Sequence, residues 1–141
     1  MPGRPSIRTK AIVLARTKLS EQDLILTLLS ERGAQLRVVA KGARKPGGRL
    51  ASRSELFCET DFLIAQGRSL GIVSDAALVD AHAGIRSDYE RVAAASAVCE
   101  VARLTCFEEV DDPYLEPICS RALRACEQAS SQAMLDLVVA A

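Results

Sequence analysis

The hydrophobic pattern of the chain changes its period near residue 84, and this change constrains the fold more than any other feature. Before it, apolar residues form short runs separated by charged residues, Gly and Pro, a pattern typical of strands and turns. After it, apolar residues recur at helical spacing. The pattern predicts an α+β fold class, with a strand domain over residues 1–80 and a helical domain over residues 81–141.

Four apolar runs are predicted to be strands: residues 10–15, 36–40, 56–65 and 70–73. Residues 66–69 join the last two runs and contain a glycine, as expected for a hairpin turn. This spacing of short runs indicates antiparallel pairing of at least the last two strands.

A further apolar run over residues 24–29 is consistent with either a helix or a strand. Ser20 followed by Asp23 is typical of a helix N-terminus, and Gly33 could end such a helix. A strand that turns at residues 31–34 into the next strand fits the pattern equally well. If the run is a strand, five short strands in about 75 residues predict a small closed barrel, because closure removes exposed strand edges.

The helical half is predicted to begin with an Ala-rich helix over residues 89–107, after a capping box formed by Ser87 and Glu90. This helix is apolar over much of its circumference, so we expect it to be buried among neighbours. The acidic run over residues 108–112 ends the helix and is expected to be a solvated connection, in which Asp112 helps to cap the next helix.

Two further helices are predicted. The second has Pro117 in its first turn, where a missing N–H costs nothing. Its apolar stripe consists of Cys119, Ala122, Leu123 and Cys126. A third helix, capped by Ser130 or Ser131, would contain Met134, Leu135, Leu137 and Val138. Because its apolar face would be left uncovered, we expect the helical domain to be truncated and the chain to be the front part of a longer protein.

The sequence carries no catalytic or metal-binding signature. It has no GxxxxGK[ST] phosphate loop, GxGxxG, HExxH or GxSxG motif. The five cysteines form no CxxC pair and are odd in number, so we expect buried core residues rather than disulfides or a zinc site. His82 is the only histidine, and it is expected to be a linker or surface residue. We therefore expect a protein that is not an enzyme and that uses no cofactor or metal.

The N-terminus is basic but is not followed by a signal-peptide pattern. No apolar run approaches the roughly 20 residues that span a bilayer. These features predict a cytoplasmic protein that has no membrane partner.

The charge of the chain is divided between its two parts. Residues 1–54 contain 12 Lys and Arg against 3 acidic residues, a balance of +9, whereas residues 55–141 contain 6 against 15, a balance of −9. Such asymmetry indicates that the first part binds a polyanion. Residues 41–53 hold three Gly, one Pro and five Lys or Arg, so a mobile basic loop is predicted there.

If the strands close into a barrel, basic residues near the first and third strands and on the adjoining loop could follow a phosphate backbone. The candidate DNA-binding residues are Lys10, Arg16, Lys18, Arg37, Lys41, Arg44, Lys45, Arg49 and Arg53. Residues 1–56 contain no aromatic residue, and Phe57 and Phe62 fall in a predicted strand as core residues. Because single-strand binders usually stack bases on aromatic side chains, we expect binding here to be electrostatic and tolerant of sequence.

Four motifs stand in order along the first part: AIVL at residues 11–14, EQD at 21–23, ILTLLSERG at 25–33 and VAKGARKP at 39–46. They resemble the AIVL, E-x-D, ILTLLT-x-x-x-G and VAKGARRP motifs of the RecO family of bacterial recombination mediators. The sequence DYER at residues 88–91 stands where that family leads into its helical part.

The resemblance implies an OB-fold barrel over residues 1–80 followed by an α-helical domain, and a strand at residues 24–29. It implies a protein that binds single- and double-stranded DNA, anneals complementary strands and assists recombinase loading in DNA repair and homologous recombination. The implied partners are RecR and single-strand-binding protein, and the implied location within the cytoplasm is the nucleoid. Lys41, Arg44 and Lys45 match the family's basic motif, so DNA binding is expected of them in particular. Many members carry a C-terminal cysteine cluster for zinc, which the cysteines of this chain do not match.

A second interpretation is a protein-interaction module. In that case the basic barrel would bind acidic protein tails, such as those of single-strand-binding proteins, in place of DNA or in addition to it. Competition between an acidic peptide and DNA would distinguish shared from separate sites.

Overall fold

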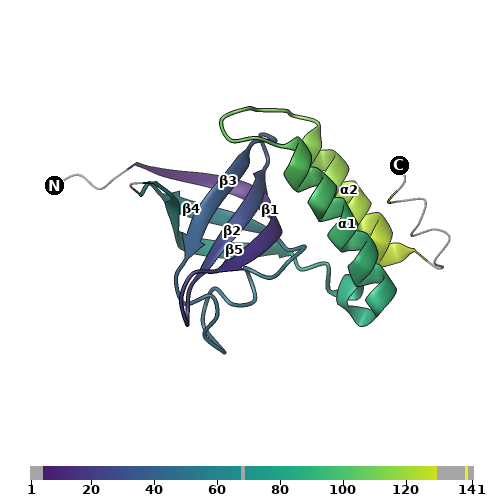
Figure 1. Cartoon of the computed structure of the whole chain (residues 1–141), viewed down its shortest axis with the longest axis horizontal. Helices are drawn as coiled ribbons and strands as arrows, with labels where there is room; N and C mark the ends of the chain where they lie inside the picture. Colours follow the sequence, from purple (N-terminus) through teal and green to yellow (C-terminus); the bar gives the residue numbers. More distant parts are fainter. Residues whose placement is uncertain (1–4, 68, 130–138, 140–141) are drawn as a thin grey trace.

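The computed structural model describes residues 5–67, 69–129 and 139 of the 141-residue chain. Five strands come first: β1 (Ser6–Lys18), β2 (Leu24–Ser30), β3 (Gln35–Ala40), β4 (Glu59–Ala65) and β5 (Gly71–Asp80). A short 3-10 helix, η1 (Ala83–Ser87), leads to the helices α1 (Tyr89–Thr105) and α2 (Leu115–Gln128). The strands and the two helices lie side by side as separate layers (Figure 1), so the chain has the predicted α+β architecture.

The five strands form a closed barrel in the order β1-β2-β3-β5-β4. Neighbouring strands are antiparallel except β3 and β5, which pair in parallel at Val38–Gly71 and Val39–Ile72. The 13-residue β1 pairs with β4 through its first half and with β2 through its second half, and a bulge at Val13/Ala15 lies in the second half. Because bulges bend a strand, this long strand can join both neighbours and close the barrel.

Residues 24–29 lie in a strand, as the family resemblance implied, and not in a helix. The predicted β4–β5 hairpin is also present, but its limits were wrong. Phe57 precedes β4 and has a left-handed backbone with φ 76°, although its side chain is buried as predicted. β5 continues to Asp80, well past the predicted end at residue 73. Its second part buries only Ala76, so it lacks the apolar alternation that would have revealed it.

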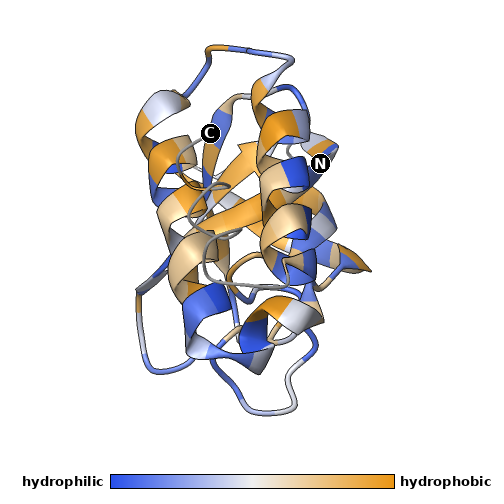
Figure 2. Ribbon diagram, turned by 90° about the vertical axis from the view of Figure 1, so that its right-hand side faces the viewer, coloured by the Kyte–Doolittle hydropathy of each residue, from blue (hydrophilic) through white to orange (hydrophobic). Residues whose placement is uncertain are grey.

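Two apolar clusters hold the fold together. One fills the barrel and is built on inward-facing residues such as Val13, Leu26 and Phe62. The other lies between the barrel and the helices, where Ile12 and Leu29 meet helical residues. Figure 2 shows the helices in front of the apolar strands. All five cysteines are free and buried, as predicted, and four of them belong to the second cluster.

α1 begins at the predicted Tyr89, but its cap differs from the prediction and it ends at Thr105, two residues before the predicted end. Its N-cap is Asp88, whose side chain accepts a hydrogen bond from the Arg91 backbone N–H, so the proposed Ser87 cap is wrong. The Ser87 hydroxyl instead donates to the Gly84 carbonyl. α1 also has an exposed face that includes Leu104, 61% exposed, so it is not buried around its circumference. In the described part of the chain, α2 and the barrel cover only its other side.

α2 agrees with the predicted second helix. Pro117 lies in its first turn, and Cys119, Leu123 and Cys126 of the stripe are buried. The loop before it is exposed and acidic, and Asp112 accepts a hydrogen bond from the Tyr114 backbone N–H just ahead of the helix. The predicted third helix, residues 130–138, lies outside the described residues. Neither α1 nor α2 has the length and apolar character of a membrane span, and the described residues offer no other candidate.

Candidate nucleic-acid interface

Basic side chains gather at the end of the barrel where β1 ends, β2 begins and β3 ends. Lys18 of β1 and Ala40 of β3 both pair with Leu24 of β2, so the ends of these strands lie level. Arg16 lies two residues before Lys18 on β1, so the two side chains point to the same side of the strand. Lys41 is the residue directly after Ala40. Arg16, Lys18 and Lys41 are all exposed. The register of the sheet therefore brings together charges that are far apart in the sequence.

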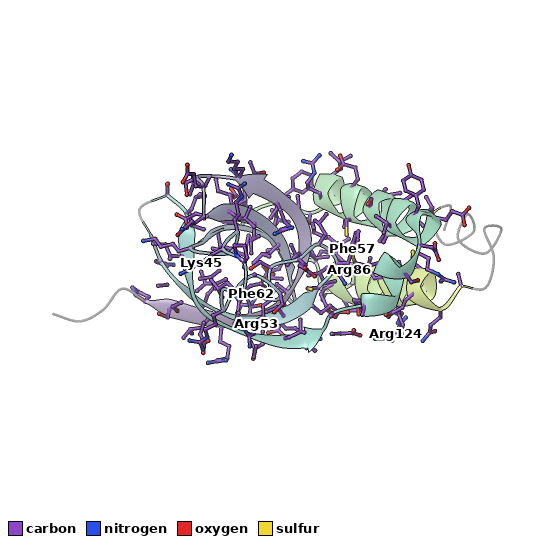
Figure 3. The ribbon with its side chains drawn as sticks, turned by 90° about the horizontal axis from the view of Figure 1, so that it is seen from below. Lys45, Arg53, Phe57, Phe62, Arg86 and Arg124 are labelled. Carbon is purple, nitrogen blue, oxygen red and sulfur yellow. The ribbon has the colours of Figure 1, made fainter. Side chains whose placement is uncertain are left out.

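Lys45 extends this basic group, whereas Arg37 does not. Lys45 is exposed in the loop that follows β3, at the side of the molecule remote from the helices (Figure 3). Arg37 lies in β3 opposite Thr27 and is exposed, but it lines a hollow together with Glu108 and Glu109 of the α1–α2 loop. We call the set of Arg16, Lys18, Lys41 and Lys45 the basic end. Among the described residues, none of these four side chains forms an ion pair.

Arg44 lies beside the basic end but has partners of its own. Its Nη1 donates to the backbone carbonyls of Ser20 and Glu21, the latter at 3.0 Å. Its backbone N–H donates to the Gln22 carbonyl at 2.8 Å. Arg44 therefore ties the loop after β3 to the loop between β1 and β2.

Arg49 and Arg53 are less available than the sequence suggested. Arg49 forms an ion pair with Asp75 of β5, so its charge is already balanced by a neighbour. Arg53 is half-buried, and its guanidinium donates to the Arg49 carbonyl. The Arg53 carbonyl in turn accepts from the Thr60 hydroxyl at 2.9 Å. These two arginines fasten the long loop to β4 and β5.

The structure places Lys10 away from the basic end. Its ammonium lies 3.7 Å from the Glu116 carboxylate of α2, on the side of β1 that faces the helices. Burial raises the pKa of Glu116, and the charge of Lys10 opposes that rise. Lys10 was expected at the start of a short strand, but β1 begins earlier and turns this residue toward α2.

The opposite end of the barrel carries acidic residues. The β2–β3 turn and the loop between α1 and α2 meet there around a hollow of about 590 Å³, whose acidic lining residues are Glu31, Glu109 and Asp111. Arg8 and Arg32 also line this hollow. The charge asymmetry of the sequence thus becomes a polarity along the barrel, with the basic end at one side and a mixed, acid-rich end at the other.

No aromatic side chain is exposed on the described part of the barrel. Phe57 and Phe62 are its only aromatic residues, and they are 3% and 0% exposed. Phe57 lies under the Arg86 guanidinium, 5.9 Å from its ring centroid (Figure 3). The exposed aromatic side chains, Tyr89, Phe107 and Tyr114, belong to the helical part. The basic end therefore offers charge but no surface for base stacking.

His82 is fully buried, which contradicts its expected place on a linker surface. Its Nε2 lies 2.6 Å from Glu59 of β4, and its Nδ1 lies 3.1 Å from Glu127 of α2. Burial alone would lower the pKa of His82, but these carboxylates outweigh it and raise the pKa. Burial likewise opposes ionisation of Glu59, but hydrogen bonds from His82 and Ser120 outweigh it and lower its pKa. A single histidine gave no sequence signal for this network.

The ligand atoms of Glu59, Asp80 and His82 lie within 4.8 Å of one another, so these residues are the described group that could hold a metal ion. However, both ring nitrogens of His82 already lie at hydrogen-bonding distance from carboxylates. A charged imidazole between carboxylates accounts for this geometry without a metal.

Comparison with known proteins decides the family. A family model described as "Recombination protein O N terminal" matches residues 4–82, more than half of the chain. The chain belongs to the RecO family.

Three RecO relatives illustrate the range of similarity. "DNA repair protein RecO" of Bifidobacterium adolescentis is 42% identical over 99 residues, covering 70% of this chain and 40% of the relative. The protein of that name from Synechococcus elongatus is 39% identical over 127 residues, which cover 90% of this chain and 48% of the relative. The protein of that name from Roseiflexus sp. is 39% identical over 118 residues, which cover 84% of this chain and 41% of the relative. The chain thus spans less than half the length of these RecO relatives.

The RecO motifs coincide with the parts that build the basic end. The matched region ends at His82, two residues after β5, so it contains the whole described barrel. The VAKGARKP motif, residues 39–46, runs from the end of β3 into the basic loop. The EQD motif, residues 21–23, forms the loop against which that segment lies. Two separated RecO motifs are therefore in contact at this end of the barrel.

Proposed function

We propose that this RecO chain binds the phosphate backbone of DNA through the basic end of its barrel. The observation that carries the proposal is the convergence of four exposed cations from the ends of β1 and β3 and the following loop, none of which has an acidic partner among the described residues. Lys and Arg that neutralise phosphates release counterions, and this release favours binding. We leave Lys10, Arg49 and Arg53 out of the interface, because each already contacts protein groups, and Arg37, because it lies beside Glu108 and Glu109.

The same surface suits strand annealing. Two complementary strands repel each other through their phosphates, and a basic surface screens this repulsion. The lack of exposed aromatic side chains on the described barrel leaves the bases unstacked and free to pair. We therefore propose that the chain anneals complementary strands and binds single and double strands with little sequence preference.

The wider role follows from the family. We propose that the complete protein is a DNA repair and recombination mediator that assists recombinase loading on single strands coated by single-strand-binding protein. RecR and single-strand-binding protein are the proposed partners. The barrel is proposed to be an OB-fold, which is supported by its five strands in the order β1-β2-β3-β5-β4. We also propose that this mediator role is not enzymatic.

Salt titration of DNA binding tests the site. Replacing Arg16, Lys41 and Lys45 by Ala should weaken binding to a labelled oligonucleotide in an anisotropy assay. The slope of log K against log salt should fall by about 2 on single strands and about 3 on duplex DNA, because three phosphate contacts are lost.

The matched control replaces three exposed arginines that lie elsewhere, Arg32, Arg121 and Arg124, and changes the net charge equally. This control should retain nearly the full slope. Equal slopes for the two triple variants would mean that net charge alone attracts DNA and that the basic end is not the site. Absence of any binding by the wild-type chain at low salt would instead favour acidic protein tails as the ligand.

A further inference from the structure

An acidic residue stands inside the basic end and calls for an explanation. Asp23 immediately precedes β2 and lies between the ends of β1 and β3, where Lys18 and Lys41 are. A carboxylate beside a phosphate-binding surface repels the ligand, and at short range this repulsion is appreciable. If charge alone shaped this surface, Asp23 would weaken it.

The contacts of Asp23 give it a different role. Its Oδ1 accepts a hydrogen bond from the Gly42 backbone N–H at 2.8 Å. Its own backbone N–H donates to the Ser20 hydroxyl at 3.2 Å, and its carbonyl accepts from the Leu19 N–H at 3.1 Å. Gly42 has φ +73°, a left-handed conformation that turns the chain directly after Lys41. Asp23 thus holds the point at which the basic loop leaves β3.

Arg44 completes the same connection from the other side. Its guanidinium bridges the carbonyls of Ser20 and Glu21, and its backbone N–H donates to the Gln22 carbonyl. Four hydrogen bonds therefore join residues 20–23 to residues 42–44. Lys41 and Lys45 flank the tied segment, and no described group bonds to their ammonium groups.

We propose that Asp23 and Arg44 are positioning residues, which hold residues 41–45 in the shape that presents Lys41 and Lys45 to DNA. This inference rests on the proposed DNA binding. Holding a loop in its bound shape removes an entropy cost from binding, so such residues raise affinity without touching the ligand. The gain from order at Asp23 outweighs the repulsion from its charge.

Two substitutions of Asp23 separate order from charge. Asp23→Asn removes the charge but keeps an oxygen that can accept from Gly42, whereas Asp23→Ala removes both. Both variants make the chain more positive by the same amount. We expect Asp23→Ala to bind a labelled single strand about fivefold more weakly than wild type, which corresponds to one lost hydrogen bond, and Asp23→Asn to bind at least as tightly. Amide exchange at Gly42 and Arg44 should accelerate in Asp23→Ala only.

The outcome is read against wild type and Lys45→Ala. If wild type binds and Lys45→Ala weakens binding, the DNA site stands, and tighter binding by Asp23→Ala would then overturn the positioning role alone. A wild-type chain that does not bind would overturn the proposed function before any Asp23 variant is considered.

A second pair of variants covers the case in which Asp23→Ala does not fold, which its circular dichroism would reveal. Arg44→Gln and Lys45→Gln are near neighbours and each removes one positive charge. Positioning predicts that Arg44→Gln weakens binding and also accelerates amide exchange at Gly42, whereas Lys45→Gln weakens binding without that acceleration. Unchanged exchange at Gly42 in Arg44→Gln would show that Arg44 contributes only its charge.

Discussion

His82 combines full burial, a left-handed backbone at φ 47° and two carboxylate partners. It lies directly after the barrel, and its ring reaches Glu59 of β4 on one side and Glu127 of α2 on the other. Ser120 of α2 donates to the same Glu59 oxygen, and Glu127 also accepts from the Gly84 N–H. One side chain thus links the barrel to the far end of α2.

Removing this imidazole should destabilise the whole chain. We expect His82→Asn to lower the free energy of unfolding by about 3 kcal/mol, because Glu59 would be left buried without its charged partner. Asn tolerates the left-handed backbone, so the loss reports on the ring and not on strain. Urea unfolding followed by circular dichroism measures it. A loss below about 1 kcal/mol would mean that water or Lys10 replaces the imidazole.

The same network predicts how stability depends on pH. The pKa of His82 is raised in the folded state, so its stabilising contribution is complete below its unfolded pKa of about 6.5. That contribution is lost as the pH rises through the raised folded pKa. The free energy of unfolding should therefore fall as the pH rises above about 6.5, ahead of the alkaline range in which cysteine thiols titrate in the unfolded chain. His82→Asn should lack this fall, and an unchanged pH profile in the variant would assign the effect to other groups.

The turn between β2 and β3 is the second connection between barrel and helices. Gly33 has φ +87° in this turn, and a Cβ placed on it would lie 1.7 Å from the Asp112 carbonyl oxygen. The Asp112 N–H donates to the Arg32 carbonyl, and the Gln35 N–H donates to the Phe107 carbonyl. The Gln35 amide further donates to the Arg103 and Cys106 carbonyls that end α1. The α1–α2 loop is therefore held on the barrel by backbone contacts.

Gly33→Ala should be far more costly than the same change at another left-handed glycine. We expect a loss of about 3 kcal/mol or more in the free energy of unfolding, from backbone strain and displacement of the α1–α2 loop. Gly47 is the matched control, since it has φ +72° and no atom within 4 Å of an added Cβ. Gly47→Ala should cost only about 1 kcal/mol of strain. Urea unfolding measures both losses. Similar losses of unfolding free energy for Gly33→Ala and Gly47→Ala would show that the α1–α2 loop moves aside without an energetic penalty.

The elements that the sequence predicted well are those with a clear apolar pattern. β1 and β3 contain short buried apolar runs and α2 buries helically spaced residues, and their existence was predicted correctly. β2 buries six of its seven residues, so its pattern fitted a helix or a strand, and only the family resemblance implied the strand. The second part of β5 was missed because it buries little. The contacts of Asp23, Lys10 and His82 were also missed, because their partners Gly42, Glu116 and Glu127 lie 19 or more residues away. Only the folded chain shows which of the nine candidate cations remain free.

At the scale of the molecule, the barrel presents different surfaces in three directions. Its basic end faces away from the helices, its acid-rich end meets the α1–α2 loop, and one outer face is covered by the helices. That covered face includes Ile12, Leu14 and Leu29, each no more than 5% exposed. DNA binding and helix packing therefore use separate parts of the same barrel.

This separation predicts the behaviour of the barrel alone. A fragment of residues 1–82 lacks α1 and α2 and would expose Ile12, Leu14 and Leu29, an apolar patch of the kind that drives association. We expect the fragment to self-associate in sedimentation and to bind a hydrophobic dye, yet to keep the salt slope of the whole chain for DNA.

Replacing Ile12 and Leu29 by Thr should restore a monomer in the fragment, whereas it should destabilise the whole chain by about 2 kcal/mol or more. A monomeric, dye-silent fragment would show that the helices are not needed to cover this face, and a lost salt slope would place part of the DNA site on the helices.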